Sequence, residues 1–478
     1  MNLKIGSRYL PLVVDLDGTL IRTDLLIESF FAHVGRDPSR IFTLAATALT
    51  GKSRLKAEIA QGTALDAAHL PYDQRILSLI NEARSHGRQV YLASASNERY
   101  VGEIAAHLGL FDGWFASTAS ENLSSEVKAR RLVEAFGEKR FDYVGDSEAD
   151  LPVWAAANKC IGVDLSTSLC TALKKIDPEA VLLQPSDKRR RNWLKLLRVH
   201  QWSKNALVFV APLSAHLSDL RSIAVSSLAF CAFSFAAASI YIVNDLVDLE
   251  ADRKHRTKRL RPLAAGTVPP AQAMLAVPVL LAASLGVGLL ISWRFALVLG
   301  IYLVLTTAYT LYLKTKMMLD VIVLASLYTL RVISGAVAVS TILPSEWLLG
   351  SSMFFFTSLA LIKRYVDLAV RVDGGLPDPT NRNYRKSDLG TIGALAAASG
   401  LNAVTIFALY ISSETVHRLY RHPHALWLVC PVLMYWIARA LILADRRRMN
   451  DDPIMFALKD RNSLLAFGLI GLIMIAAA

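Results

Sequence analysis

Two stretches of the sequence carry acidic residues at spacings that suit chemistry on phosphate groups. The first, LVVDLDGTLIRTD, ends an apolar run with Asp15 and Asp17, which are followed by Gly-Thr. The second, YIVNDLVDLEADRKHRTKRLRPLAAG, carries three aspartates three and four residues apart, just ahead of a basic run; these are Asp245, Asp248 and Asp252. Any function proposed for the chain has to account for both stretches.

The first stretch predicts a β-strand that delivers two carboxylates to the edge of a sheet. In parallel sheets, this carboxyl edge is where ligands bind. Asp15 could attack phosphorus as a carboxylate nucleophile, and Asp17 would then protonate the leaving oxygen. Two later strand-like runs end in further polar residues: RQVYLASASN in Ser94 and FDYVGDSEAD in Asp146 and Asp150.

A lysine completes this phosphoryl-transfer set. The segment SSEVKARRLVEAFG predicts a helix with Lys128 in its first turn. The carboxylates would bind Mg²⁺, while the lysine and Ser94 would neutralise the phosphate. Ser96 lies in the same run and is the alternative to Ser94. The competing interpretation is a folded domain whose residues have lost their catalytic task.

The second stretch predicts a helix that continues out of a membrane span, with its three aspartates along one face. Carboxylates stacked beside a membrane repel one another and are costly to desolvate, so a cation is expected among them. Mg²⁺ takes oxygen ligands and is usually shared between carboxylates and substrate phosphates. The following cations could bind the remaining phosphate oxygens; these are Lys254, Lys258, Arg259 and Arg261. A lipid-facing loop would explain the basic residues but not the acidic ones.

The charge distribution divides the chain into a soluble part and a membrane part. Residues 1–186 hold 20 Lys and Arg against 23 Asp and Glu, and the remainder holds 32 against 17, so the net charge of +12 arises beyond residue 186. We expect an α/β domain at 1–186, a basic linker at 187–200 and an all-α membrane domain at 201–478. The basic excess interleaved with apolar runs favours a membrane protein over a nucleic-acid binder.

The membrane part contains nine apolar stretches near the length of a membrane span. The first is interrupted by Ser203, Lys204 and Asn205, and the last is short. They are 202–217, 222–243, 271–291, 294–313, 317–340, 346–363, 391–411, 424–443 and 463–478.

Alternate loops between these stretches are rich in Lys and Arg, as expected of cytoplasmic loops. This pattern places the N-terminal domain in the cytoplasm and the C-terminus outside, in a bacterial-type inner membrane. The N-terminal apolar stretch lacks the features of a signal peptide. Four cysteines without a CxxC pair suggest buried thiols rather than zinc or disulfides; these are Cys160, Cys170, Cys231 and Cys430.

DLDGT and GDSEAD at strand ends make residues 10–185 resemble the haloacid dehalogenase (HAD) superfamily of phosphatases. The resemblance implies a Rossmann-like fold with a small helical cap at about 20–85. It implies that Asp15 is the nucleophile and Asp17 the general acid/base, that both are metal ligands, and that Ser94 and Lys128 contact phosphate. Asp146 would bind the metal, and Asp150 would bind the metal or the lysine.

NDLVDLEAD resembles the first aspartate-rich motif of the UbiA-type intramembrane prenyltransferases, a likeness that extends over about residues 192–478. The superfamily has about nine membrane helices and uses Mg²⁺ to bind a diphosphate. Within the superfamily, four segments resemble decaprenyl-phosphate phosphoribosyltransferases more closely. They are RVHQWSKNALVFVAPL, residues 248–266, YLKTKMMLDVIVLASLYTLRVISGAVA and SLALIKRYVDL. A second aspartate-rich motif is replaced by KRYVDL, where only Asp367 is acidic, and this departure disfavours alkylation of aromatic rings.

The resemblance also implies roles for individual residues of the membrane part. The metal ligands would be Asp245, Asp248 and Asp252. Substrate contacts would come from Lys204, Asn244, Lys258, Arg261, Lys363, Arg364 and Tyr365. Lys204 could instead extend to the membrane surface. Asp320 and Arg331 lie inside an apolar span, where ionisable residues are costly, and they are too far apart along a helix to pair directly.

Together these interpretations predict a bifunctional, Mg²⁺-dependent enzyme of cell-envelope biosynthesis. The membrane domain would transfer 5-phosphoribose from phosphoribosyl diphosphate to a polyprenyl phosphate, and the HAD domain would dephosphorylate the product. One alternative is prenyl transfer to an aromatic or other acceptor with an independent phosphatase. Another is a transporter with a regulatory domain, which leaves the acidic residues unexplained. Small residues in SGAVAVS and LAAASG suit helix packing within one bundle or in a homo-oligomer.

Overall fold

The computed structural model describes residues 10–36, 66–118, 121–184, 189–339, 346–379, 382–449 and 452–478. Its backbone divides into two compact units. The first holds Met1–Arg198 together with Tyr241–Pro278, and the second holds Val199–Ile240 together with Val279–Ala478. The segment Tyr241–Pro278 therefore groups with the N-terminal residues, although the sequence pattern assigned it to the membrane domain. The predicted domain limits at 186 and 200 stay a prediction.

Six parallel strands form one sheet in the first unit, in the order β3-β2-β1-β4-β5-β6. They are β1 (Leu12–Asp15), β2 (Val90–Asn97), β3 (Gly113–Ser117), β4 (Asp142–Gly145), β5 (Cys160–Val163) and β6 (Val181–Leu183). Leu12 of β1 pairs with Val90 on one side and with Asp142 on the other. The strand order reverses between β1 and β4, because β2 and β3 lie on one side of β1 and the later strands lie on the other. In α/β sheets, ligands bind at the carboxyl ends of the strands beside such a reversal.

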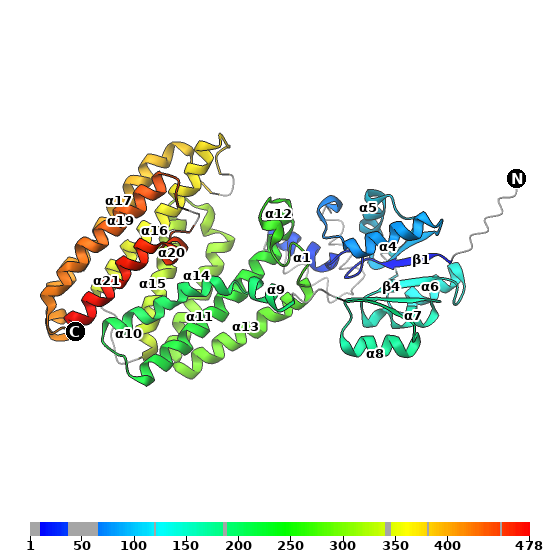
Figure 1. Ribbon diagram of the computed structural model, residues 1–478, viewed down its shortest axis with the longest axis horizontal. Helices are drawn as coiled ribbons and strands as arrows, with labels where there is room; N and C mark the ends of the chain where they lie inside the picture. The colour runs from blue at the N-terminus through cyan, green and yellow to red at the C-terminus, as the bar shows by residue number, and fades with distance from the viewer. Residues whose placement is uncertain are drawn as a thin grey trace. The chain divides into compact units, whose positions relative to one another are not determined.

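Both faces of this sheet are buried, because its strands are nearly continuous apolar runs. Leu12 and Val14 face one hydrophobic cluster, and Val13 faces the other. Helices α4 (Gln74–Ser85) and α5 (Glu98–Leu108) cover the first face (Figure 1). The second face is covered by α6 (Glu126–Phe136), α7 (Leu151–Ala156) and α8 (Thr167–Ile176). The Rossmann-like fold predicted for the N-terminal domain is confirmed.

The predicted cap is only partly described. Helix α1 (Leu25–Arg36) begins soon after β1, and a 3₁₀ turn at Ala67–His69 leads into α4. Residues 37–65, the middle of the predicted cap at about 20–85, lie outside the described residues. The first unit also contains α9 (Arg189–Leu196) in the predicted linker, α12 (Leu249–Lys254) and a 3₁₀ turn at Lys258–Leu260.

The membrane part is helical, as predicted. Its remaining helices are α10 (Val210–Ser214), α11 (Leu220–Val247), α13 (Pro270–Ile291), α14 (Trp293–Leu311), α15 (Leu319–Val339), α16 (Glu346–Asp373), α17 (Leu389–Ile411), α18 (Glu414–Leu419), α19 (Val429–Asp445), α20 (Pro453–Lys459) and α21 (Arg461–Ala477). Short 3₁₀ segments lie at Val199–Phe209, Leu313–Thr315, Lys386–Asp388 and Pro423–Leu428.

Six helices among the described residues are long and apolar enough to cross a membrane, or seven if α20 and α21, bent by 81°, count as one span. The chain is thus a multi-pass membrane protein, with fewer such helices than the nine expected. The stretch 202–217 is not one helix but a 3₁₀ segment followed by the short α10. The stretch 346–363 does lie in a long helix, α16, which continues through charged residues to Asp373.

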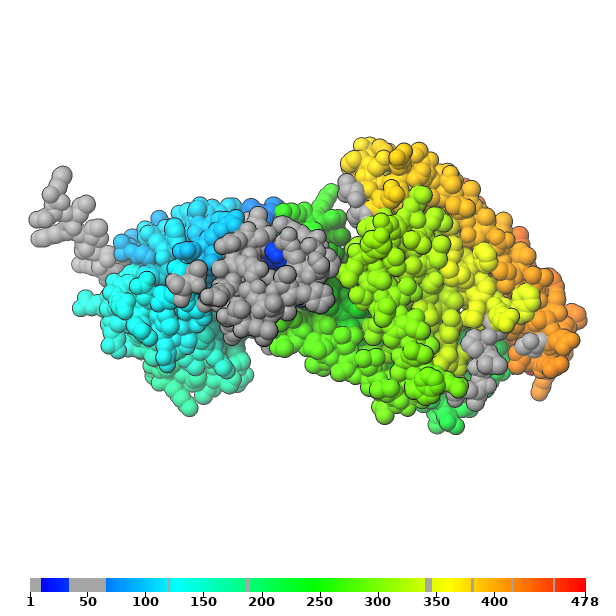
Figure 2. Space-filling view, turned by 180° about the vertical axis from the view of Figure 1, so that it is seen from behind, coloured from blue at the N-terminus to red at the C-terminus, as the bar shows by residue number. Residues whose placement is uncertain are grey.

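Helices of the membrane part differ in what they pack against. On α14, large apolar side chains are exposed, among them Val304 at 71% and Leu297 at 58%, and Figure 2 shows this light-green helix at the surface. In a membrane such side chains contact lipid rather than water. By contrast, α15 buries thirteen of its residues, so it is a central helix of the second unit. All four cysteines are free thiols; Cys160 and Cys430 are buried as expected, whereas Cys170 and Cys231 are only partly buried.

Candidate functional site

The first strand ends at the candidate nucleophile. Asp15 is the last residue of β1 and Asp146 directly follows β4, so both lie at the reversal of strand order. In the loop that follows β1, Gly18 has a φ of +79°, a backbone conformation that favours glycine. A Cβ atom at Gly18 would lie 2.2 Å from a carboxylate oxygen of Asp146. The Gly of DLDGT therefore lets the loop approach Asp146 closely.

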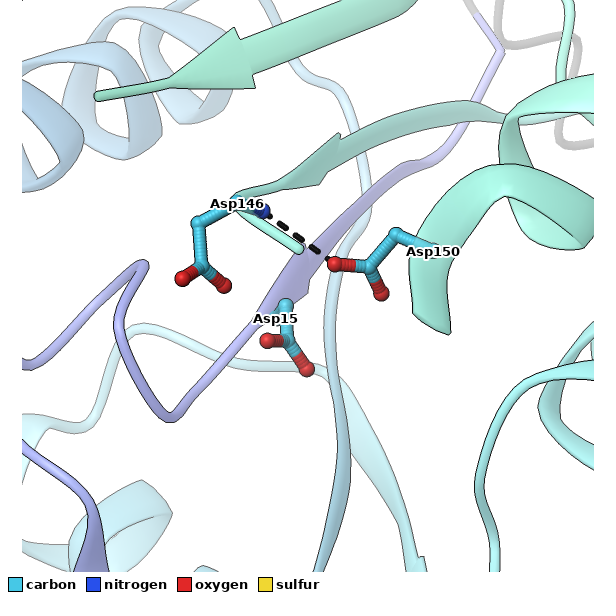
Figure 3. A group of neighbouring side chains, drawn as sticks. All are labelled: Asp15, Asp146 and Asp150. Atoms are coloured by element: carbon cyan, nitrogen blue, oxygen red, sulfur yellow. Dashed lines mark hydrogen bonds between the residues drawn. The ribbon is translucent and has the colours of Figure 1, made fainter. Parts of the chain in front are cut away.

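Three carboxylates converge at this edge of the sheet, as Figure 3 shows for Asp15, Asp146 and Asp150. One carboxylate oxygen from each lies within 4.8 Å of the other two. The backbone N–H groups of Asp146 and Ser147 donate to Asp150, at 3.2 and 3.1 Å, and Thr19 donates to Asp146 at 3.1 Å. These bonds hold the group in place and leave oxygens facing one another.

The electrostatics of this group fit a divalent cation. Burial raises the pKa of Asp15 to about 7; Lys128 opposes the shift, whereas Asp150 and Asp17 add to it. Burial, with repulsion from Asp15 and Asp150, also raises the pKa of Asp146 well above its ordinary value. Anions gathered in this way favour a counter-charge, and three carboxylates are an oxygen donor set that suits Mg²⁺. The acidic group is therefore a candidate metal site.

Lys128 is the cation already present in this site. Its Nζ donates to Asp15 at 2.8 Å, to the Tyr143 hydroxyl at 2.9 Å and to Asp150 at 3.3 Å. Burial alone would lower the pKa of Lys128, but Asp15 and Asp150 outweigh burial and raise it above its ordinary value. The lysine therefore stays charged, which is what charge neutralisation of a phosphate requires.

Asp17 points to the serines instead of the acidic group. Its Oδ2 accepts from Ser96 at 2.6 Å and from Ser94 at 3.1 Å, and its Oδ1 accepts from the N–H of Leu25 at 2.9 Å. Both serine hydroxyls are buried on β2, so this geometry does not separate Ser94 from Ser96. The role of Asp17 as a metal ligand stays a prediction, since its carboxylate is outside the converging group.

Tyr143 is a site residue that the sequence analysis missed. Its hydroxyl donates to Asp150 at 2.7 Å while accepting from Lys128. The available signal was a tyrosine inside a buried strand next to GDSEAD, because a buried tyrosine hydroxyl usually needs a hydrogen-bond partner. The sequence of the strand does not say which partner that is.

The second acidic stretch is arranged differently from the expected single helix. Helix α11 ends at Val247, and Asp248 precedes α12. Asp245 and Asp252 are buried, whereas Asp248 is exposed. Among the described residues, only the group at Asp15 brings three acidic ligand atoms within 4.8 Å, so these three aspartates do not close on one another.

Arginines occupy the position between the two buried aspartates. Arg261 Nη1 lies 2.6 Å from Asp252 and 3.1 Å from Asp245, and Arg198 Nη2 lies 2.5 Å from Asp245. Lys258 lies 3.8 Å from Asp252. Arg261 and Lys258, which the sequence predicts as phosphate contacts, here pair with the acidic residues. Arg198, which the sequence analysis did not single out, joins them. The expected positive charge is supplied here by side chains.

The second unit holds the other predicted contacts. Lys204 is buried and forms an ion pair with Asp452. Arg364 lies 2.7 Å from Asp320 and 2.6 Å from Asp367. Tyr365 instead donates to Asp445 at 2.5 Å.

Asp320 and Arg331 do not pair with each other, as expected. Asp320 accepts from Tyr384 at 2.6 Å in addition to its ion pair with Arg364. Arg331 donates to Asn205 at 2.8 Å and to the Tyr302 hydroxyl at 2.9 Å.

A cavity of about 380 Å³ opens beside the charged end of α16. Four cations and one carboxylate line it; they are Lys363, Arg364, Arg371, Arg382 and Asp367. Arg382 and Arg364 share Asp367, at 3.0 and 2.6 Å. Among the described residues Lys363 forms no hydrogen bond or ion pair. The excess of positive charge suits an anionic ligand such as a phosphate.

Comparison with known proteins gives the class of each part. Residues 12–154 match haloacid dehalogenase-like hydrolases, and residues 206–467 match the UbiA prenyltransferase family. The chain belongs to the UbiA prenyltransferase family and carries an N-terminal HAD domain. It is therefore a UbiA-superfamily transferase fused to a hydrolase domain.

Individual relatives cover different shares of the chain. The uncharacterized protein y4nM of Sinorhizobium fredii is 38% identical over 98% of this chain and 91% of its own length. Decaprenyl-phosphate phosphoribosyltransferase of Mycolicibacterium smegmatis is 39% identical over 56% of this chain and 86% of its own length. The structure of a UbiA homologue from Archaeoglobus fulgidus bound to GPP and Mg²⁺ covers 60% of this chain and 97% of that chain, with 18% identity and a TM-score of 0.45.

Proposed function

We propose that the membrane part transfers 5-phosphoribose from phosphoribosyl diphosphate to a polyprenyl phosphate. The HAD domain then removes the 5-phosphate from the lipid-linked product. Both active sites would lie on the cytoplasmic side of a bacterial inner membrane, with the C-terminus outside. Positive charge concentrated in alternate loops supports this orientation.

The geometry at Asp15 supports the following hydrolase step. Lys128 holds one carboxylate oxygen of Asp15, and the other would attack the phosphorus of the 5-phosphate. The P–O bond to the ribose breaks as the aspartyl phosphate forms, and the ribose oxygen takes a proton from Asp17. Water then cleaves the aspartyl phosphate and loses its proton to Asp17, which releases inorganic phosphate and restores Asp15.

Neighbouring groups prepare these residues for the two steps. Ser94, Ser96 and the N–H of Leu25 fix the Asp17 carboxylate. Lys128 offers positive charge to the phosphate oxygens. Asp15, Asp146 and Asp150 would hold Mg²⁺, which offsets the negative charge of the phosphate when it is bound.

For the transferase step, the phosphate oxygen of the lipid would attack the anomeric carbon of the ribose. The bond from that carbon to the diphosphate breaks, and pyrophosphate leaves with the electron pair. Asp245, Asp248 and Asp252 would hold Mg²⁺ together with the diphosphate, supported by Asn244. Arg261 and Lys258, which now contact the aspartates, would turn part of their donors to the phosphate oxygens.

The cavity of the second unit supports binding of an anion on the transferase side. Lys363 and Arg364 line it, as expected of phosphate contacts, and Lys204 is held near the start of the membrane part by Asp452. Tyr365 does not line this cavity, and its role in substrate binding rests on the sequence resemblance alone.

The observation that carries the proposal is the presence of both chemistries in one chain. The Asp15 site suits a phosphomonoester, and the membrane part is 39% identical to a phosphoribosyltransferase whose product, on this mechanism, carries a phosphomonoester. The test is an assay in membranes with Mg²⁺, phosphoribosyl diphosphate labelled in the ribose and polyprenyl phosphate. We expect labelled lipid and release of pyrophosphate, and Asp245→Asn should reduce both at least 100-fold.

The same assay separates the alternatives. A wild-type protein that forms no labelled lipid would refute phosphoribosyl transfer. With a polyprenyl diphosphate and an aromatic acceptor as substrates instead, formation of a prenylated product would establish prenyl transfer.

A further inference from the structure

The aspartate-rich loop, residues 248–266, packs against the hydrolase part of the first unit. Helix α12 contacts α1 and the 3₁₀ turn at Ala67–His69. Gly266, at the end of the loop, has a φ of +64°, and a Cβ there would lie 2.5 Å from Arg22 Cβ and 2.7 Å from the Arg22 carbonyl oxygen. The close approach explains why a glycine stands at this position.

A bidentate ion pair lies at the centre of this contact. Arg253 of α12 donates from Nη1 to Glu28 Oε2 at 2.6 Å and from Nη2 to Glu28 Oε1 at 2.5 Å. The two side chains are only 6% and 11% exposed. Buried and bidentate, the pair has a fixed geometry, unlike exposed pairs, which contribute little. Nearby, Lys254 and Asp66 form such an exposed pair at 3.0 Å.

Arg253 also fixes the shape of the loop that follows it. Its Nε donates to the carbonyl oxygen of Ala264 at 3.2 Å, so one side chain joins both ends of the segment 253–264. That segment carries Arg261, which contacts Asp252 and Asp245. Glu28 orients Arg253, and Arg253 in turn holds the loop that brings Arg261 to the aspartates.

The first turn of α1, which carries Glu28, also reaches the hydrolase site. Helix α1 begins at Leu25, whose N–H binds Asp17, and Thr23 donates to Glu28. One short helix thus touches the hydrolase residue Asp17 and the loop that carries the transferase residues.

We propose that Glu28, a residue of the hydrolase domain, is a positioning residue for the transferase. It acts through Arg253 to hold the loop 253–264, and with it Arg261, in the arrangement that receives a diphosphate. This proposal rests on the proposed function for the identity of the diphosphate, but not for the ordering of the loop.

Hydrogen–deuterium exchange of the full-length protein in nanodiscs tests the ordering without any substrate. Glu28→Gln keeps the size of the side chain and removes its charge, and we expect amides of 253–266 to exchange at least 5-fold faster. Asp66→Asn, which weakens the exposed pairs of Asp66 with Lys254 and His69 and leaves the Glu28–Arg253 pair intact, is the matched control and should change exchange less than 2-fold. Equal exchange in Glu28→Gln and wild type would overturn the proposal.

Kinetics then separate positioning from simple support of the fold. With phosphoribosyl diphosphate and polyprenyl phosphate, Glu28→Gln should raise KM for the diphosphate about 10-fold and change KM for the lipid less than 2-fold. Hydrolysis of p-nitrophenyl phosphate at the Asp15 site should stay within 2-fold. Equal impairment of transfer and hydrolysis, or faster exchange with unchanged transfer kinetics, would contradict a positioning role. If the wild type transfers no phosphoribose, the proposed function fails. The positioning role is then tested by binding of Mg²⁺-pyrophosphate, which should weaken about 10-fold in Glu28→Gln; unchanged binding would overturn that role.

Discussion

At the scale of single residues, the hydrolase site is an excess of buried negative charge held around one lysine. Lys128 contacts Asp15 and Asp150, yet three carboxylates converge there. Removing a partner from such a group leaves an unbalanced buried charge, which costs more than the loss of a surface ion pair. We therefore expect the site to depend on a cation, and this dependence can be measured.

Magnesium should stabilise the hydrolase domain more at pH 8 than at pH 5. Without the cation, burial raises the pKa of Asp15 to about 7. The folded protein then keeps a proton that the unfolded chain releases above about pH 4, so stability falls as pH rises from about 4 to 7. A bound cation favours the carboxylate and removes this loss. We expect Mg²⁺ to raise Tm by about 5 °C at pH 8 and by about 1 °C at pH 5, measured by calorimetry.

The control for this prediction is Asp15→Asn combined with Asp146→Asn, which removes two of the three carboxylates. In that variant the dependence of the Mg²⁺ effect on pH should disappear. Equal stabilisation of the wild type at both pH values would show that the cation does not act through these carboxylates.

Tyr143→Phe should reduce hydrolysis of a phosphomonoester about 10-fold in kcat, because the hydroxyl orients both Lys128 and Asp150. The loss of stability should be about 1 kcal/mol, the typical net value of a hydrogen bond. Tyr91→Phe is the matched control. Tyr91 lies on β2 of the same sheet and packs against Phe115 and Phe136. A similar loss of kcat in both variants would argue against a role for the Tyr143 hydroxyl.

The sequence predicts residues of this site well where a motif fixes them to a strand end. Asp15, Asp146, Asp150 and Lys128 converge because parallel strands bring their carboxyl ends to one edge. It predicts poorly those residues whose role depends on a long-range contact. Arg198 reaches Asp245 from a segment 47 residues earlier, and no spacing rule connects them.

At the scale of elements, polar residues explain why the first apolar stretch of the membrane part is not a span. Asn205 accepts from Arg331 and donates to Ser234 at 3.0 Å, and Lys204 pairs with Asp452. These polar residues interrupt the apolar stretch, but each has a polar partner in the second unit. A 3₁₀ segment in place of a long helix is the result, and its partners lie too far along the chain to be predicted.

Close backbone packing of the same segment gives a prediction for stability. A Cβ built on Gly335 of α15 would lie 1.9 Å from the Val208 carbonyl oxygen. Gly335→Ala must therefore push the 3₁₀ segment away from α15, and we expect a loss of about 2 kcal/mol, the usual cost of overpacking. Thermal unfolding in detergent, followed by circular dichroism, measures this.

Gly300 of α14 is the matched control, since a Cβ there meets nothing within 4 Å. Gly300→Ala should leave Tm unchanged or raise it, because alanine favours helix over glycine by about 1 kcal/mol. Equal decreases of Tm in the two variants would mean that packing against Val208 is not the cause.

At the scale of the whole molecule, one chain combines a transferase of the UbiA family with a hydrolase domain. Fusion raises the effective concentration of one site's product at the other. The division into a soluble α/β part and a helical membrane part follows from charge and hydropathy. The grouping of Tyr241–Pro278 with the N-terminal residues does not, because it depends on side chains such as Glu28 and Arg253 that meet across 225 residues.

The central claim is that the hydrolase consumes what the transferase makes, and Asp15→Asn tests it most directly. Asparagine keeps the shape of the side chain but cannot serve as the nucleophile, so hydrolysis should fall by at least about 1,000-fold while transfer continues. In membranes supplied with Mg²⁺, ribose-labelled phosphoribosyl diphosphate and polyprenyl phosphate, the lipid products are separated by thin-layer chromatography. We predict lipid-linked ribose from the wild type and lipid-linked phosphoribose from Asp15→Asn. The same ratio of the two lipids from both proteins would contradict the account.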